Sequence, residues 1–288
     1  MHPLIGTAEL ASMLEGPRPP TLLDVRWALA GPSGERLYAA GHLPGAAFAD
    51  IDTDLAGPPG AGGRHPLPAP ADLQAALRRL GVRSDRPVVA YDAGNGSTAA
   101  RAWWLLRWAG HAEVAVLDGG YAAWTAEGRD IETGPDGGVS GGEPAEGDFV
   151  VRPGQMLVLT AETAAALTTD GGVLLDARAP ERFAGEVEPI DPAAGHVPGA
   201  RNAPAAGNVG ADGRWLAPAA LAERFAALGV RPDAQVGAYC GSGVTACSLV
   251  LALEVAGLTS AEQPAALYAG SWSHWCTDPT RPIATGPD

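Results

Sequence analysis

The two halves of this chain carry the same short segments in the same order. The matching segments are LLDVR at 22–26 with LLDAR at 174–178, GHLPGA at 41–46 with GHVPGA at 195–200, and LGVR at 80–83 with LGVR at 228–231. Further along, AYD at 90–92 matches AYC at 238–240. Position 92 therefore corresponds to position 240, with the same offset that separates positions 80 and 228. A repeat of about 150 residues is typical of domain duplication, because solenoid units are much shorter. The sequence therefore predicts two domains of one fold.

The repeats place the domain boundaries near the middle of the chain. We expect the first domain at residues 1–133 and the second at residues 151–288. Residues 134–150 between them begin with GPDGGVSGGEPAEG, which is too rich in glycine and proline to form a regular element. This stretch is the expected linker, and the total of 288 residues suits two domains of ordinary size.

Short apolar runs alternate with helical patterns along the chain. In the first half the expected elements are strands at 21–25, 88–91 and 114–117, and helices at 4–14, 71–80 and 98–109. Such alternation predicts the α/β class, with a mainly parallel sheet and helices on both faces in each domain. Trp103, Trp104 and Trp108 have helical spacing, which predicts that they form part of the core and the domain interface.

The charge and composition exclude several classes of function. A formal net charge of −14 argues against nucleic acid or an anionic membrane surface as a partner. All 19 basic residues are arginine, so neither a lysine Schiff base nor a phosphate-loop lysine is available. Three cysteines without metal-type spacing predict no zinc site and no disulfide framework, and no cofactor is implied. With no basic, apolar leader and no long apolar run, a cytoplasmic protein is expected.

The segment VGAYCGSGVTACSLVLALEVAG at 236–257 indicates a nucleophile. Cys240 follows an expected strand, and Gly241, Ser242 and Gly243 are small enough for consecutive backbone N–H groups to turn inward. A helix is expected from Val244 or Thr245. Such an N–H cradle at a helix start favours an anion, and so favours the nucleophilic thiolate of Cys240. The alternative is a buried structural cysteine.

The duplication provides an internal control for this hypothesis. Asp92 stands in the first half where the second half has Cys240. A carboxylate cannot act as a sulfur nucleophile, so only the second copy is expected to retain the chemistry. Sites in open α/β sheets form beyond the carboxyl ends of the strands, where both positions fall.

These features resemble the tandem-domain rhodanese family of sulfurtransferases. Each half has a D-x-R strand end and a G-H-[LV]-P-G-A loop, and only the second half has the cysteine. The stretch LYAGSWSHW at 267–275 is similar to the C-terminal signature of that family, with His274 where an acidic residue is usual. The resemblance covers about residues 4–286 and implies sulfur transfer through a persulfide on Cys240. It also implies a small-molecule sulfur donor, a thiol or cyanide as acceptor, and a thioredoxin-like reductant as a candidate partner.

The resemblance also assigns roles to individual residues. Arg182 matches the arginine that binds the anionic end of the donor, and Ser242 with His42 matches a proton relay, for which Glu35 is the nearest acidic candidate. The N–H groups of Gly241, Gly243, Val244 and Thr245 would hold the substrate. The loop at 240–245 resembles that of mercaptopyruvate sulfurtransferases, since Gly241 and Ser242 replace the two basic residues of animal thiosulfate sulfurtransferases. A second substrate arginine has no counterpart, because residues 188–191 read EPID.

Other interpretations of the same residues stay open. A thiosulfate-preferring sulfurtransferase needs a cation near the loop, and a persulfide carrier or binding module needs no turnover. A cysteine phosphatase is disfavoured because Ala246 stands where a phosphate-binding arginine is required. Arg182 could be a solvated surface arginine, and His42 and His196 could share a structural role because their loops are duplicated. Cys247 lies about two helical turns after Cys240 and is expected in the core, with a resolving thiol the alternative, and Cys276 is assigned to neither role.

Overall fold

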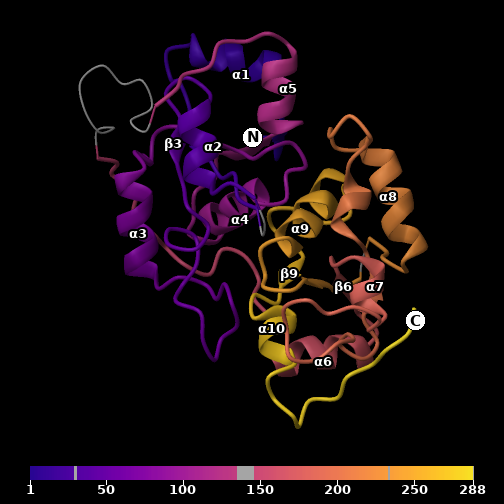
Figure 1. The fold of residues 1–288 in the computed structure, drawn as a ribbon. Helices are drawn as coiled ribbons and strands as arrows, with labels where there is room; N and C mark the ends of the chain where they lie inside the picture. The colour runs from indigo at the N-terminus through magenta and orange to yellow at the C-terminus, as the bar shows by residue number, and fades with distance from the viewer. Residues whose placement is uncertain (29–30, 135–145, 233, 288) are drawn as a thin grey trace. The chain divides into compact units, whose positions relative to one another are not determined.

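The computed structural model describes residues 1–28, 31–134, 146–232 and 234–287 (Figure 1). Most of the expected linker, at 135–145, lies outside the described residues. The chain forms two compact units. Unit 1 consists of Met1–Gly57, Pro68–Gln155 and Val209–Trp215, and unit 2 consists of Pro58–Leu67, Met156–Asn208 and Leu216–Asp288. Each unit thus includes a short segment from the other half of the sequence.

Unit 1 is built on a five-stranded sheet in the order β1-β5-β4-β2-β3, with every strand pairing parallel. Its strands are β1 (Leu4–Ile5), β2 (Thr21–Asp24), β3 (Ala47–Phe48), β4 (Val88–Tyr91) and β5 (Val114–Leu117). Its helices are α1 (Thr7–Leu14), α2 (Gly34–Ala40), α3 (Pro70–Arg79), α4 (Ala99–Trp108) and α5 (Gly120–Ala126). The expected helix at 4–14 therefore begins as a strand, because residues 4 and 5 pair with β5.

Unit 2 has a four-stranded parallel sheet in the order β7-β6-β8-β9. Its strands are β6 (Val173–Asp176), β7 (Arg201–Asn202), β8 (Val236–Tyr239) and β9 (Ala266–Leu267). Its helices are α6 (Ala161–Thr169), α7 (Pro180–Phe183), η1 (Ala205–Asn208), α8 (Pro218–Ala227), α9 (Ala246–Val255) and α10 (Ser271–Trp275). The prediction of two α/β domains with mainly parallel sheets is confirmed.

Buried apolar strands and helices form the core of each unit. All four residues of β4 and of β8 are buried, as a strand covered on both faces requires. Trp103 and Trp104 in α4 are fully buried, which confirms their prediction as core residues. The described part of the chain contains no helix long and apolar enough to cross a membrane.

Buried ion pairs fix the strand ends that precede the duplicated loops. Asp176 accepts hydrogen bonds from Arg178, with a shortest distance of 2.6 Å, and Arg178 also donates to the Gly195 carbonyl oxygen at 2.7 Å. Asp24 and Arg26 repeat this arrangement in unit 1, again at 2.6 Å. Burial alone would lower the pKa of Arg178, but the Asp176 carboxylate outweighs burial and raises it. Arg178 therefore stays charged and ties the loop to the sheet.

Candidate active site

Cys240 lies directly after β8, an interior strand of the unit 2 sheet, and only 3% of its surface is exposed. The backbone N–H of Gly243 donates to the Cys240 Sγ atom at 3.1 Å. Gly243 has a φ of +84°, and a Cβ atom there would collide with the Ala269 carbonyl oxygen. Only glycine fits this turn, so the loop sequence places a backbone N–H on the sulfur. Helix α9 begins at Ala246, slightly later than expected.

The segment before and within α10 binds the backbone of Cys240. The Cys240 N–H donates to the Ser271 Oγ atom at 3.1 Å, and the Trp272 N–H donates to the Cys240 carbonyl oxygen at 3.0 Å. Ser271 has a φ of +54°, the one positive value among the non-glycine residues that the structure describes. Its hydroxyl also donates to the Tyr268 carbonyl oxygen at 2.9 Å, which holds this strained residue in place. The C-terminal signature thus orients the peptide groups of Cys240.

A histidine that the sequence did not single out contacts Ser242. The His65 Nδ1 atom lies 2.7 Å from the Ser242 Oγ atom, and both residues are more than nine-tenths buried. His65 belongs to the Pro58–Leu67 segment of unit 2. The hydrogen bond that the structure shows for Ser242 is therefore with His65, and the relay of Ser242 with His42 remains a prediction.

His42 lies in unit 1 and has a counterpart of the same geometry in unit 2. Its Nδ1 atom lies 2.8 Å from the Tyr38 carbonyl oxygen, and its ring stacks on Tyr38 at 3.9 Å between centroids. His196 repeats both contacts with Phe183, at 2.8 Å and 3.7 Å. Because the two fully buried histidines share one set of contacts, each fixes the loop that carries it.

Two guanidinium groups adjoin Gly241, the residue after Cys240. A Cβ atom placed on Gly241 would lie 2.9 Å from Arg64 Nη2 and 3.5 Å from Arg182 Nη1. Arg64 is held by its own N–H, which donates to the Ser273 Oγ atom at 3.1 Å. The loop sequence itself offers no cation, and Arg64 places beside Gly241 a second guanidinium group that the sequence did not single out. A larger side chain at Gly241 would displace the arginines.

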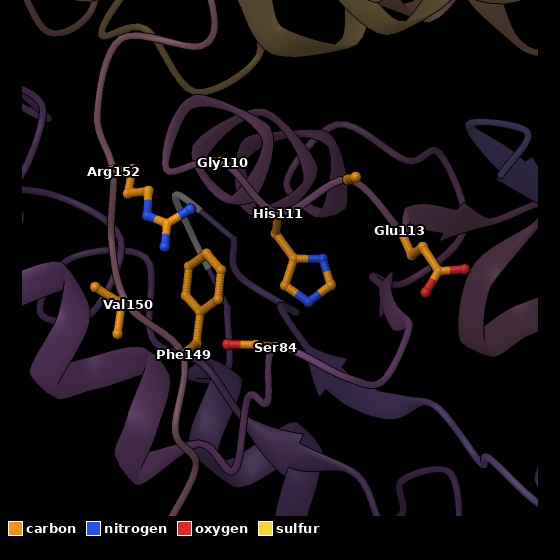
Figure 2. A pocket seen from close by; sticks show the side chains of 8 residues that line it. Ser84, Gly110, His111, Glu113, Phe149, Val150 and Arg152 are labelled. Atoms are coloured by element: carbon orange, nitrogen blue, oxygen red, sulfur yellow. The ribbon is translucent and has the colours of Figure 1, made fainter.

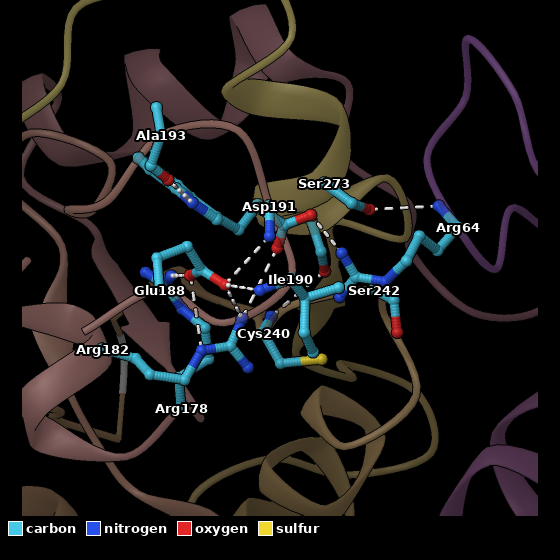
Figure 3. Close-up of polar contacts among 12 residues, drawn as sticks. Arg64, Arg178, Arg182, Glu188, Ile190, Asp191, Ala193, Cys240, Ser242 and Ser273 are labelled. Carbon is cyan, nitrogen blue, oxygen red and sulfur yellow. Dashed lines mark hydrogen bonds and ion pairs between the residues drawn. The ribbon is translucent and has the colours of Figure 1, made fainter. Parts of the chain in front are cut away.

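Two buried carboxylates bind these arginines (Figure 3). Arg182 donates to Glu188 at 2.6 Å, and Arg64 and Arg182 both contact Asp191. The side chains of Glu188 and Asp191 are each 4% exposed. Arg182 is thus a partly covered ion-pair partner, not a solvated surface arginine.

The two carboxylates differ in their electrostatics. Burial alone would raise the pKa of Glu188, but hydrogen bonds from Arg182 and from the N–H groups of Asp191 and Ile190 outweigh burial and lower it. Burial raises the pKa of Asp191, and the charges of Arg64 and Arg182 offset only part of this rise. Glu188 is therefore the more firmly ionised of the two carboxylates.

The unit 1 loop that corresponds to the Cys240 loop holds its own anion. The Asp92 carboxylate accepts hydrogen bonds from the N–H groups of Gly94 at 2.9 Å, Gly96 at 3.0 Å and Thr98 at 3.0 Å. With the offset between positions 92 and 240, Gly94 and Gly96 correspond to Ser242 and Val244. The Thr98 hydroxyl also donates to this carboxylate at 3.2 Å, so the loop binds a negative charge mainly through backbone N–H groups.

The remaining candidate residues lie at the start of α9 or, in the case of Cys276, at the end of α10. Val244 is buried, and Thr245 occupies the N-cap position of α9 without a side-chain capping bond. The Cys247 thiol is buried and donates to the Gly243 carbonyl oxygen at 3.4 Å. Burial raises the pKa of Cys276, which keeps that thiol protonated. Within the described ranges, no cluster of three or more His, Cys, Asp or Glu side chains could hold a metal ion.

A family model for the rhodanese-like domain matches this chain twice, at residues 6–127 and 160–278. The chain belongs to the rhodanese family. It is 50% identical over 289 residues to a Pseudomonas aeruginosa protein named as a 3-mercaptopyruvate sulfurtransferase, covering 98% of both chains. It is also 48% identical over 285 residues to a Mycobacterium tuberculosis protein, SseB, named as a thiosulfate sulfurtransferase, covering 98% of this chain and 97% of that one.

Solved structures of the family agree with this placement. The crystal structure of SseA from Escherichia coli matches with a TM-score of 0.80 and 32% identity, over 95% of this chain and all of that one. The relatives' names agree on sulfur transfer and differ on the donor. The chain is accordingly a sulfurtransferase.

Proposed function

We propose that this chain transfers a sulfane sulfur from 3-mercaptopyruvate, through a persulfide on Cys240, to a thiol or to cyanide. The proposal rests on two features that occur together. The Gly243 N–H donates to the Cys240 Sγ atom, and two guanidinium groups lie beside Gly241. An N–H cradle stabilises a negatively charged sulfur, and the arginines can bind the donor's carboxylate. The negative charges on the sulfur and on the donor's carboxylate are the two that the site must stabilise during the reaction.

The chemistry balances without a cofactor. The Cys240 thiolate attacks the donor sulfur, the carbon–sulfur bond breaks, and its electron pair leaves on the enolate of pyruvate. The proton of the donor thiol ends on that enolate, which becomes pyruvate, while Cys240 keeps an anionic persulfide. Attack of an acceptor thiolate or cyanide on the outer sulfur then restores the Cys240 thiolate.

Ser242 and His65 are suited to move the proton. The Ser242 hydroxyl belongs to the cradle loop, and its hydrogen bond to His65 provides a base that can accept a proton and return it. We assign His65 the role that the sequence suggested for His42. The departing enolate needs a proton, so the relay favours mercaptopyruvate as the donor.

The unit 1 loop supports the assignment of the persulfide site. The Asp92 carboxylate oxygens are as many bonds from Cβ as the outer sulfur of a cysteine persulfide. They accept hydrogen bonds from Gly94 and Gly96. By correspondence, the N–H groups of Ser242 and Val244 would hold the outer sulfur, with those of Gly241, Gly243 and Thr245 completing the cradle.

Thiosulfate is the second candidate donor, and the two arginines beside Gly241 favour it because they could hold its sulfonate end. The Mycobacterium tuberculosis relative is named for this donor. A thioredoxin-like reductant is a candidate acceptor. The three free cysteines fit a reducing compartment, which favours the cytoplasm.

The test is the site of sulfur loading. Protein treated with 3-mercaptopyruvate and digested without a reductant should gain the mass of one sulfur atom on the peptide that contains Cys240. Cys240→Ser should abolish both the adduct and turnover, because a hydroxyl is far less acidic than a thiol. Cys276→Ser is the matched control and should retain both. Turnover by Cys240→Ser would refute the proposal, and loading without turnover would indicate a carrier.

A further inference from the structure

Asp191 lies between the two arginines that adjoin Gly241. Its Oδ1 atom accepts a hydrogen bond from Arg64 Nη1, and its Oδ2 atom lies 3.5 Å from Arg182 Nη2. Asp191 belongs to the stretch EPID at 188–191, where a second substrate arginine has no counterpart. In the structure Asp191 contributes a negative charge to the place where a donor anion would bind (Figure 3).

The charges around the donor site are balanced. The guanidinium groups of Arg64, Arg178 and Arg182 face the carboxylates of Asp176, Glu188 and Asp191 in one chain of ion pairs. With three positive and three negative groups, the formal charge of this cluster is zero. Asp176 and Glu188 also bind backbone N–H groups and so hold the loops, whereas the contacts described for the Asp191 carboxylate are with Arg64 and Arg182.

We propose that Asp191 determines the donor preference, because its charge cancels one positive charge of the Arg64–Arg182 pair. This inference rests on the proposed function and adds a specificity-determining residue to it. The electrostatic energy of a bound donor scales with the product of the charges. The negative charge of Asp191 therefore repels a dianion such as thiosulfate twice as strongly as the singly charged mercaptopyruvate. Asp191 selects the monoanion.

The test is the ratio of kcat/KM for thiosulfate to kcat/KM for 3-mercaptopyruvate. Asp191→Asn keeps the size of the side chain and removes its charge, so this ratio should rise by about tenfold or more. Added salt should lower the thiosulfate rate of the variant more steeply than that of the wild type. Asp170→Asn, which removes an exposed charge at the end of α6, is the matched control and should leave the ratio unchanged.

A second pair of variants covers the case in which Asp191→Asn folds poorly. Arg64→Gln should change the ratio in the opposite direction, and Arg64→Gln with Asp191→Asn should bring it back toward the wild-type value, since the formal charge is restored. If Asp191 only positions Arg64, both donors will lose kcat/KM equally and the ratio will stay constant, which would overturn the inference. Failure of the proposed function is distinguishable, because neither donor would then load Cys240 in the wild type.

Discussion

The His65 Nδ1 atom lies 2.7 Å from the Ser242 Oγ atom, although the two residues are 177 positions apart in the chain. Ser242 is part of the loop that surrounds Cys240, and His65 comes from a segment of the first half of the sequence. This hydrogen bond places a titratable group next to the loop that follows Cys240, as the proposed proton relay requires. The catalytic hypothesis therefore depends on a contact between two distant parts of the sequence.

Replacing His65 should affect the two donors differently. His65→Gln should lower kcat/KM with 3-mercaptopyruvate by about a hundredfold or more, the usual contribution of a general acid or base. The loss with thiosulfate should be much smaller, because sulfite leaves with its charge and needs no proton. Steady-state rates with both donors provide the measurement. Equal losses would mean that His65 only positions the loop.

Replacing Arg182 should affect both donor binding and stability. Loss of a charge-assisted hydrogen bond costs about 1.5–3 kcal/mol, so Arg182→Ala should lower kcat/KM by roughly ten- to a hundredfold. The melting temperature should also fall, because the buried carboxylate of Glu188 loses the partner that contacts it at 2.6 Å. Arg201→Ala on β7, an exposed position, should change neither quantity. An unchanged kcat/KM would remove Arg182 from the donor site.

The sequence was sufficient for the features that are encoded locally. The duplicated segments identified two domains of one fold. The order of strand, Cys240, glycine-rich loop and helix was sufficient to predict a nucleophile at Cys240, because these elements follow one another directly in the chain. Asp92 was informative for the same reason, since it occupies the corresponding place in the other copy.

The features that the sequence missed depend on packing between distant segments. Arg64 and His65 lie in a stretch rich in glycine and proline without periodicity, where nothing indicates which unit it joins. Arg64 reaches Asp191 across 127 positions of the chain. The available signal was a charged and a titratable residue side by side in a loop, GGRHPLP at 62–68, since loops often carry functional residues.

Replacing Asp92 should destabilise the protein without touching the Cys240 loop itself. An asparagine has only one acceptor oxygen, and its NH₂ group would face backbone N–H donors now bound by the carboxylate. Asp92→Asn should therefore lower the free energy of unfolding by about 2–3 kcal/mol. Urea denaturation followed by circular dichroism is the measurement, with Asp130→Asn, at an exposed position, as the control. If Asp92→Asn and Asp130→Asn have the same urea midpoint, the negative charge of Asp92 does not contribute to stability through the loop N–H groups.

The last prediction concerns stability at low pH and His111. This side chain lines a cavity of about 300 Å³ in unit 1 with Ser84, Glu113 and Arg152, and its ring lies 5.1 Å from that of Phe149 (Figure 2). Burial lowers the pKa of His111, and the nearby Arg83 carbonyl oxygen and Glu113 carboxylate offset only part of this effect. There is thus a pH range in which His111 is neutral in the folded chain but already protonated in the unfolded chain.

The sign of the effect follows from proton binding. Between the lowered folded pKa and the ordinary unfolded value of about 6.5, the unfolded state binds more protons, so stability decreases as the pH falls through this window. One such group contributes a slope of at most about 1.4 kcal/mol per pH unit. Urea midpoints at several pH values below neutrality should therefore fall more steeply for the wild type than for His111→Gln, which cannot titrate. If the urea midpoints of the two proteins change in parallel with pH, the pKa of His111 does not differ between the folded and unfolded states, and the prediction is wrong.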